Sequence, residues 1–184
     1  MTPETKAIQI DPRFPIGRFN RPTPGQPLPE GLLAGAIGSI SELPEQLRNA
    51  LNGLDSHQLG TPYREGGWTV LQLVHHIADS HMNAFCRVRL ALTEQSPVIT
   101  GYNEKAWAEL HDSHAPAEWS LELIESLHAR WVMLLQSLTP EQMQRDFVHP
   151  EHGAQTIEFA TLLYGWHSRH HLAHITHLRG AKGW

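Results

Sequence analysis

Four long segments with the composition and spacing of α-helices constrain the fold of this 184-residue chain more than any other feature. They cover approximately residues 30–54, 69–93, 120–138 and 156–178, whereas strand signals are weak along the chain. A helix of this length in a globular protein is stable mainly because it buries one apolar face against its neighbours. The sequence therefore predicts an all-α protein with the architecture of a four-helix bundle.

Capping and breaking residues mark the expected helix ends. We expect Thr69 and Ser120 to cap the N-termini of the second and third helices. Pro44 is expected to kink or break the first helix, and Gly180 to stop the fourth.

The connections between the long helices are uneven in length. The second and third helices are joined by roughly 25 residues, which is long enough to cross the bundle, so simple up-down-up-down order is not required. A short helix is expected within this crossover at residues 104–111. Another short turn is expected at Thr139-Pro140-Glu141-Gln142, with Thr139 as its cap.

The first 29 residues contain seven prolines. Because proline fixes φ and lacks a backbone N–H, a helix cannot run through most of this segment. We expect residues 1–29 to form an extended arm laid over a single domain that covers residues 30–184.

Charge and composition argue against several classes of partner. The net charge is −5 with histidine neutral, and there is no basic run, so electrostatics give no reason to bind nucleic acid or an anionic membrane. No apolar run approaches the roughly 20 residues that span a bilayer, and no signal peptide is visible. The single cysteine, Cys86, cannot form an internal disulfide. We therefore expect a soluble cytoplasmic protein.

The 14 histidines are the most unusual feature of the composition. In the fourth helix, His167 and His171 are four residues apart and lie within about 30° of the centre of the apolar face, and His174 lies about 50° away from that centre. Two imidazoles at this spacing can bind one metal ion. The alternative is a pair of buried, hydrogen-bonded histidines, but each additional buried polar ring needs its own partner.

A third ligand is expected from the second helix, which contains His75, His76 and His81. His81 lies near the middle of the apolar face of that helix, whereas His76 lies about 120° to one side, on a polar stripe with Ser80 and Asn83. The helical wheel alone therefore slightly favours His81 and leaves His76 as the alternative.

Several motifs resemble the YfiT-like proteins of the DinB superfamily. The resemblance extends from about Pro15 to Trp184, and its most specific part is the region around His76. It is carried by the segments Thr61–Val70, His75–Asn83, Tyr102–Trp107, Trp131, Phe147–Pro150 and Trp166–Thr176.

This resemblance implies a four-helix bundle with an unusual helix order, often found as a homodimer. It also implies one divalent metal ion, zinc or nickel, bound by His76, His167 and His171, with water completing the coordination. His174, Ser80 and His81 are the residues expected to support these ligands. It further implies a metal-dependent hydrolase that acts on a small-molecule substrate, whereas relatives in the superfamily are thiol S-transferases that use bacillithiol or a similar low-molecular-weight thiol.

Three functions remain open from the sequence. A metal-dependent hydrolase would use the ion to activate water. A thiol transferase would use the same ion to deprotonate an external thiol, which fits a chain with one cysteine. A non-catalytic metal-binding bundle would close the ion off with a fourth protein ligand, such as His174 or His81.

Overall fold

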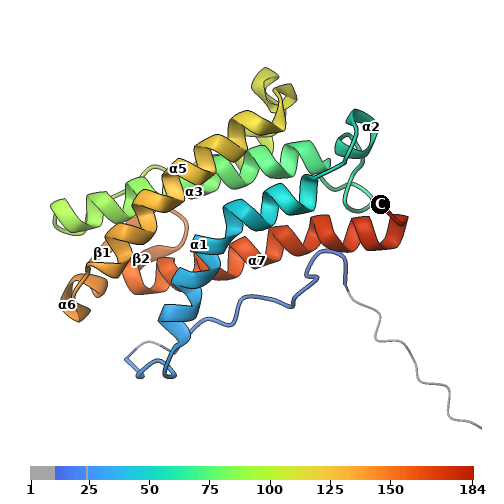
Figure 1. The fold of residues 1–184 in the computed structure, drawn as a ribbon. Coiled ribbons are helices and arrows are strands. Elements are labelled where there is room, and N and C mark those ends of the chain that lie inside the picture. Colours follow the sequence, from blue (N-terminus) through green and yellow to red (C-terminus); the bar gives the residue numbers. More distant parts are fainter. Residues whose placement is uncertain (1–10, 24) are drawn as a thin grey trace, which may run out of the picture.

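The computed structural model describes residues 11–23 and 25–184 and contains four long helices side by side (Figure 1). The predicted four-helix bundle is confirmed, and the expectation of an all-α chain misses only a small antiparallel hairpin. The long helices are α1 (Leu32–Leu51), α3 (Val70–Thr93), α5 (Ala117–Gln136) and α7 (Ile157–Lys182). The connections contain the short helices α2 (Ser56–Leu59), α4 (Glu104–Trp107), η1 (His111–His114) and α6 (Pro140–Met143), and the hairpin strands β1 (Asp146–His149) and β2 (Gly153–Thr156).

The helix order differs from a simple up-and-down bundle. Helix α1 packs mainly against α7 and α5, and α3 packs against α5 and α7, so α1 and α3 are not close neighbours although they follow one another in the chain. Figure 1 shows that α3 and α5 run in the same direction, opposite to α1 and α7. The segment between α3 and α5 is therefore a crossover that returns the chain to the end where α3 begins.

Local signals predicted some helix ends correctly. Thr69 caps α3 in a capping box with Gln72, and Thr139 does the same for α6 with Gln142. Pro44 lies inside α1 without ending it.

Three predicted helix ends are wrong. The short helix expected at residues 104–111 covers only Glu104–Trp107. Helix α5 begins at Ala117, directly after Pro116, and Ser120 lies inside it. The Ser120 hydroxyl is buried and bonds to His75 instead of capping the helix. Helix α7 runs through Gly180 and ends at Lys182, followed by Gly183, which adopts the left-handed conformation of a C-cap.

A polar layer divides the core of the bundle. One apolar cluster contains Val88 and Trp131, and the other contains Leu47 and Ile175. Between them, at mid-length of the long helices, lie buried or half-buried histidines. They are His76 and His81 on α3, His128 on α5, and His167, His170, His171 and His174 on α7. A buried imidazole nitrogen without a hydrogen-bond partner costs free energy, and among the described residues His170 Nδ1 and His174 Nε2 are two such atoms.

The described part of the predicted arm follows α7 without forming a helix or strand of its own. The Phe19 ring packs 5.7 Å from Phe159 and 5.9 Å from Trp166, measured between ring centroids. Phe14 lies 6.1 Å from His170 in the same way. Residues 1–10 and Pro24, which the prediction included in the arm, lie outside the described residues.

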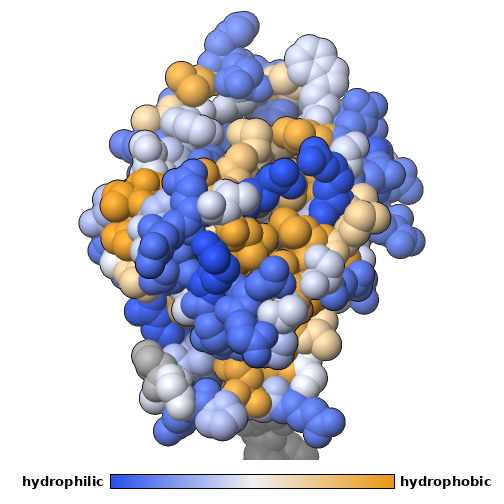
Figure 2. Space-filling model, turned by 90° about the vertical axis from the view of Figure 1, so that its left-hand side faces the viewer, coloured by the Kyte–Doolittle hydropathy of each residue, from blue (hydrophilic) through white to orange (hydrophobic). Residues whose placement is uncertain are grey.

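Hydrophobic residues reach the surface in separate areas bordered by hydrophilic ones on the side of the molecule shown in Figure 2. The described chain has no helix with both the length and the apolar character needed to cross a bilayer.

Candidate metal centre

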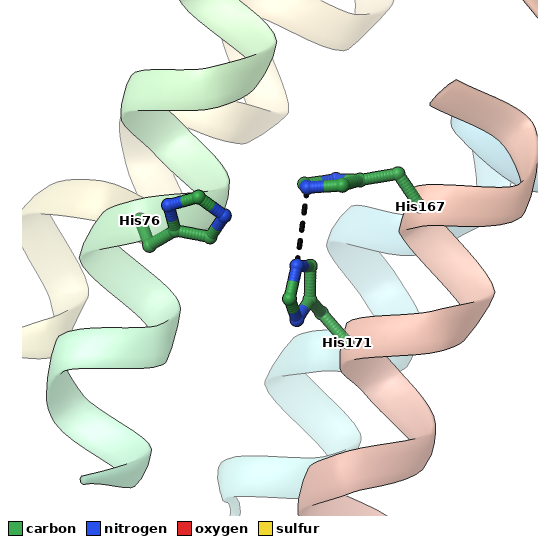
Figure 3. Close-up of side chains that lie close together, drawn as sticks. All are labelled: His76, His167 and His171. Carbon is green, nitrogen blue, oxygen red and sulfur yellow. Dashed lines mark hydrogen bonds between the residues drawn. The ribbon is translucent and has the colours of Figure 1, made fainter. Parts of the chain in front are cut away.

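The structure brings the three predicted ligands together. His76 projects from α3 toward α7, where His167 and His171 project back from successive turns (Figure 3). Each ring offers one nitrogen, and the three nitrogens all lie within 4.8 Å of one another. The spacing of four residues on α7 and the direct packing of α3 on α7 produce this arrangement.

The helical wheel slightly favoured His81 because it finds the direction of deepest burial, whereas the histidine of α3 that lies in the group of three is His76. His81 occupies that direction and is fully buried. His76, at the edge of the core, is only partly buried and has ring centroids 5.5 Å from His167 and 5.0 Å from His171.

The spacing of the α7 nitrogens matches the size of a metal site. The Nε2 atoms of His167 and His171 are 3.1 Å apart. Two nitrogens bound tetrahedrally to zinc at the usual bond length would be separated by about 3.3 Å. Three imidazoles without a carboxylate are also a donor set that suits zinc, nickel or copper. The residues therefore fit a divalent ion of this kind.

Burial keeps the three rings in the neutral form that a metal requires. It lowers the pKa of His76 to about 4, and it holds the pKa values of His167 and His171 well below the ordinary range. Mutual repulsion among the charged forms of neighbouring histidines adds to the effect at His167 and His171. A bare imidazole nitrogen is thus available near neutral pH without first losing a proton to solvent.

Aromatic rings form the walls around the three histidines. Trp68 lies 4.5 Å from His76 and Tyr164 lies 5.4 Å from His167, between ring centroids. On the far side of His171, Tyr63 lies 4.1 Å from the ring of His174. These rings limit the space from which a substrate can approach and exclude part of the surrounding water.

The three residues predicted to support the ligands differ in position. His81 contacts His167, with 3.0 Å between His81 Nε2 and His167 Nδ1. His174 contacts His171, with 3.3 Å between the two Nδ1 atoms. Ser80 instead pairs with the hydroxyl of Tyr164, 3.3 Å away, and so reaches the ligands only through that ring.

His128 of α5 was not identified in the sequence, although it contacts His81 directly with 2.9 Å between ring nitrogens. A helical wheel of α5 could have found it, because it follows the buried residues Leu121 and Ile124 at spacings of seven and four.

A second group of histidines also has nitrogens close enough to share an ion. It consists of His170, His171 and His174, all on α7. A neutral His171 has one bare nitrogen, so it can serve one of the two groups at a time. The group with His76 joins two helices and is partly open to solvent, whereas all three residues of the second group are buried.

An acidic side chain lies one helical turn beyond His76. Asp79 is half-buried, and its pKa is raised to about 6, first by the loss of hydration and then by the negative charge of Asp112. The neighbouring Tyr102 has its pKa raised to about 12, mainly by burial. The pKa of Asp79 therefore lies closer to neutral pH than that of an ordinary carboxyl group.

Comparison with known proteins identifies relatives of this chain. The model of the DinB superfamily matches residues 39–175. A Bacillus cereus protein named "putative metal-dependent hydrolase" is 51% identical over 174 residues, which cover 95% of this chain and 99% of the relative. A Bacillus thuringiensis subsp. konkukian protein with the same description has the same identity and coverage.

A solved structure is similar as well. It is described as "YfiT from Bacillus subtilis is a probable metal-dependent hydrolase with an unusual four-helix bundle topology". It shares 46% sequence identity with this chain and superimposes with a TM-score of 0.87, covering 94% of this chain and 98% of its own.

Proposed function

Because the chain belongs to the DinB superfamily, we propose that it is a metal-dependent enzyme that hydrolyses a small-molecule substrate. One divalent ion is held by His76, His167 and His171. The observation that carries this proposal is the group of three neutral imidazoles from two helices, with His76 and His167 partly exposed. The names of the relatives favour hydrolysis over thiol transfer.

An ion bound by three histidines supplies a Lewis acid that lowers the pKa of bound water toward about 7 and polarises a carbonyl oxygen. The protein contributes the positions of the ligands and the surroundings of the substrate. His81 and His174 contact the ligand rings and orient them, and Trp68 and Tyr164 shield the site.

We infer that the fourth coordination position of the ion is left for water or substrate. The group that contains His76 includes neither His81 nor His174, the two residues that would close the ion off as a fourth ligand. His81 already uses both ring nitrogens, one toward His167 and one toward His128. These contacts support an enzyme rather than a non-catalytic metal-binding bundle.

The proposal also covers the kind of metal ion, the oligomeric state and the cellular location. Neutral imidazole ligands suit zinc and nickel alike, and we propose one of these two. We also propose a homodimer, for which the exposed Trp119 and Leu123 of α5 offer an apolar contact surface. A cytoplasmic location agrees with Cys86 being a free cysteine.

A turnover assay with two kinds of substrate tests the proposal. Protein loaded with zinc or nickel is offered a panel of esters without thiol and, separately, bacillithiol with an electrophile. We expect ester cleavage that needs no thiol, disappears after chelation and returns on reloading. His76→Ala is expected to lower turnover by on the order of 10²-fold or more, because it removes a ligand.

Cys86→Ser is the matched control, since Cys86 is exposed on the same helix and is not part of the metal centre. It should leave turnover unchanged. Turnover only in the presence of the thiol would overturn hydrolysis in favour of thiol transfer, and turnover that survives chelation would overturn the metal-dependent mechanism.

A further inference from the structure

A run of buried histidines reaches from the candidate metal centre across the bundle. His167 on α7 contacts His81 on α3, with 3.0 Å between His167 Nδ1 and His81 Nε2. His81 Nδ1 lies 2.9 Å from Nε2 of His128 on α5. His128 Nδ1 lies 2.7 Å from the backbone carbonyl oxygen of Ile40 on α1. This histidine relay, formed by His128, His81 and His167, therefore connects all four long helices.

The Ile40 carbonyl gives the relay a direction, because a carbonyl oxygen only accepts hydrogen bonds. In a regular helix this oxygen would accept from the backbone N–H four residues later. That residue is Pro44, which has no N–H. His128 supplies the missing donor, so its proton must be on Nδ1.

Each ring of the relay carries a single proton. His81 is 0% exposed and His128 1% exposed. Burying a charged imidazolium without an anionic partner is costly, so both rings are held in the neutral form. A neutral imidazole has one donor and one acceptor nitrogen. His128 Nε2 therefore accepts from His81 Nδ1, and His81 Nε2 in turn accepts from His167 Nδ1.

We propose that His128 and His81 are positioning residues that hold His167 in the Nδ1-protonated tautomer, with its bare Nε2 facing His76 and His171. A free imidazole exchanges between two tautomers, and only one of them presents a bare Nε2. The relay disfavours the Nε2-protonated tautomer of His167 and fixes the orientation of its ring. The benefit to metal binding rests on the proposed function, but the tautomer itself is a property of the metal-free chain.

The other proposed ligand on α7, His171, is held in the opposite tautomer. Since His167 Nε2 is an acceptor, His171 Nε2 must be the donor across the 3.1 Å that separates the two atoms. His171 Nδ1 then accepts from His174 Nδ1, 3.3 Å away. Before His171 can offer Nε2 to an ion, it must move its proton to Nδ1. His167 needs no such change.

Nuclear magnetic resonance of the metal-free wild-type protein tests the relay directly. Long-range ¹H–¹⁵N correlations distinguish protonated from bare ring nitrogens in each histidine. We expect a proton on Nδ1 and a bare Nε2 in His128, His81 and His167 near pH 7.5. On titration with Zn²⁺, His171 should change tautomer and His167 should keep its own. A proton on Nε2 of His167 in the metal-free chain would overturn the proposal, with no mutant required.

A pair of variants tests whether His128 acts on the site. His128→Phe keeps a buried ring but removes both hydrogen bonds. We expect His167 to show a mixture of tautomers and Zn²⁺ affinity, measured by chelator competition, to fall roughly 10–100-fold. Leu135→Ala is the matched control, because it opens a cavity at another buried position of α5 and removes no hydrogen bond.

The outcomes separate the relay from the proposed function. If Leu135→Ala loosens the site as much as His128→Phe does, or if His128→Phe keeps both the wild-type tautomer and affinity, the relay is wrong. A wild-type chain with the expected tautomers that takes up no metal would support the relay and overturn the proposed function.

Discussion

Adjacent histidines on α3 have different roles because they meet different partners. Both ring nitrogens of His75 are bonded, Nδ1 to the Ser120 hydroxyl at 2.7 Å and Nε2 to the Ala115 carbonyl at 3.0 Å. His75 thus joins α3 to α5 and to the end of the crossover. The ring of His76 packs against the rings of Trp68, His167 and His171, and no side-chain hydrogen bond within the described chain occupies its nitrogens. A ring with a free nitrogen is the one that can bind a metal.

This difference predicts opposite results for two neighbouring substitutions. His76→Ala should leave the purified protein with little bound metal, because one of three ligands is gone. His75→Ala should keep about one ion per chain but lower the free energy of unfolding by roughly 1–3 kcal/mol, because it leaves buried partners unpaired. Elemental analysis and urea unfolding measure the two effects. A fully occupied His76→Ala protein would falsify the ligand assignment.

Helices α1 and α7 approach each other closely at a glycine. A Cβ atom added at Gly165 would lie 2.7 Å from the Cβ of Ala36 and 2.8 Å from its carbonyl oxygen. Ala36 is itself buried in α1. Gly165 is two residues before His167, so this contact sets the distance of the ligand-bearing part of α7 from α1.

Gly165→Ala is therefore expected to overpack the contact between these helices and to lower the free energy of unfolding by roughly 1–3 kcal/mol. Gly180→Ala is the control in the same helix, since an added Cβ meets nothing within 4 Å there. It should raise the free energy of unfolding by about 0.5–1 kcal/mol, because alanine favours the helix more than glycine does. Urea unfolding compares the two, and equal effects would contradict this view of the contact.

At the scale of the whole molecule, the histidine layer makes folding sensitive to acid. The pKa values of His76 and His128 are about 4 in the fold, against an ordinary value of 6.5. Between these two values the unfolded chain binds more protons than the folded one, so the free energy of unfolding rises with pH. Asp79 acts in the opposite sense over part of this range, because its pKa is raised to about 6.

The metal-free protein should therefore lose several kcal/mol of stability as the pH falls from about 6.5 toward about 4, well before most carboxylates are protonated. Several buried histidines shift in the same direction, and together they outweigh one half-buried aspartate. Urea unfolding at a series of pH values measures the slope. A free energy of unfolding that is flat or rises on acidification in this range would show that the layer is already charged or solvated.

Local features of the sequence were enough to predict much of this structure. Helical spacing located the four long helices, and capping chemistry located Thr69 and Thr139. The spacing of four residues put His167 and His171 on one face of α7, because that relation depends only on the helix itself. The hairpin escaped prediction because its strands are four residues each, too short for a clear alternation.

Only the tertiary structure decided how the histidines divide their roles. On the helical wheel His81 faced the core better than His76, but the wheel does not show which helix lies opposite. Packing placed α7 opposite His76, and it placed His81 between His128 and His167. The carbonyl that directs the relay lies 88 residues before His128 and is free because of Pro44. Sequence periodicity describes one helix at a time, whereas the candidate metal centre and its support depend on four helices meeting at one level of the bundle.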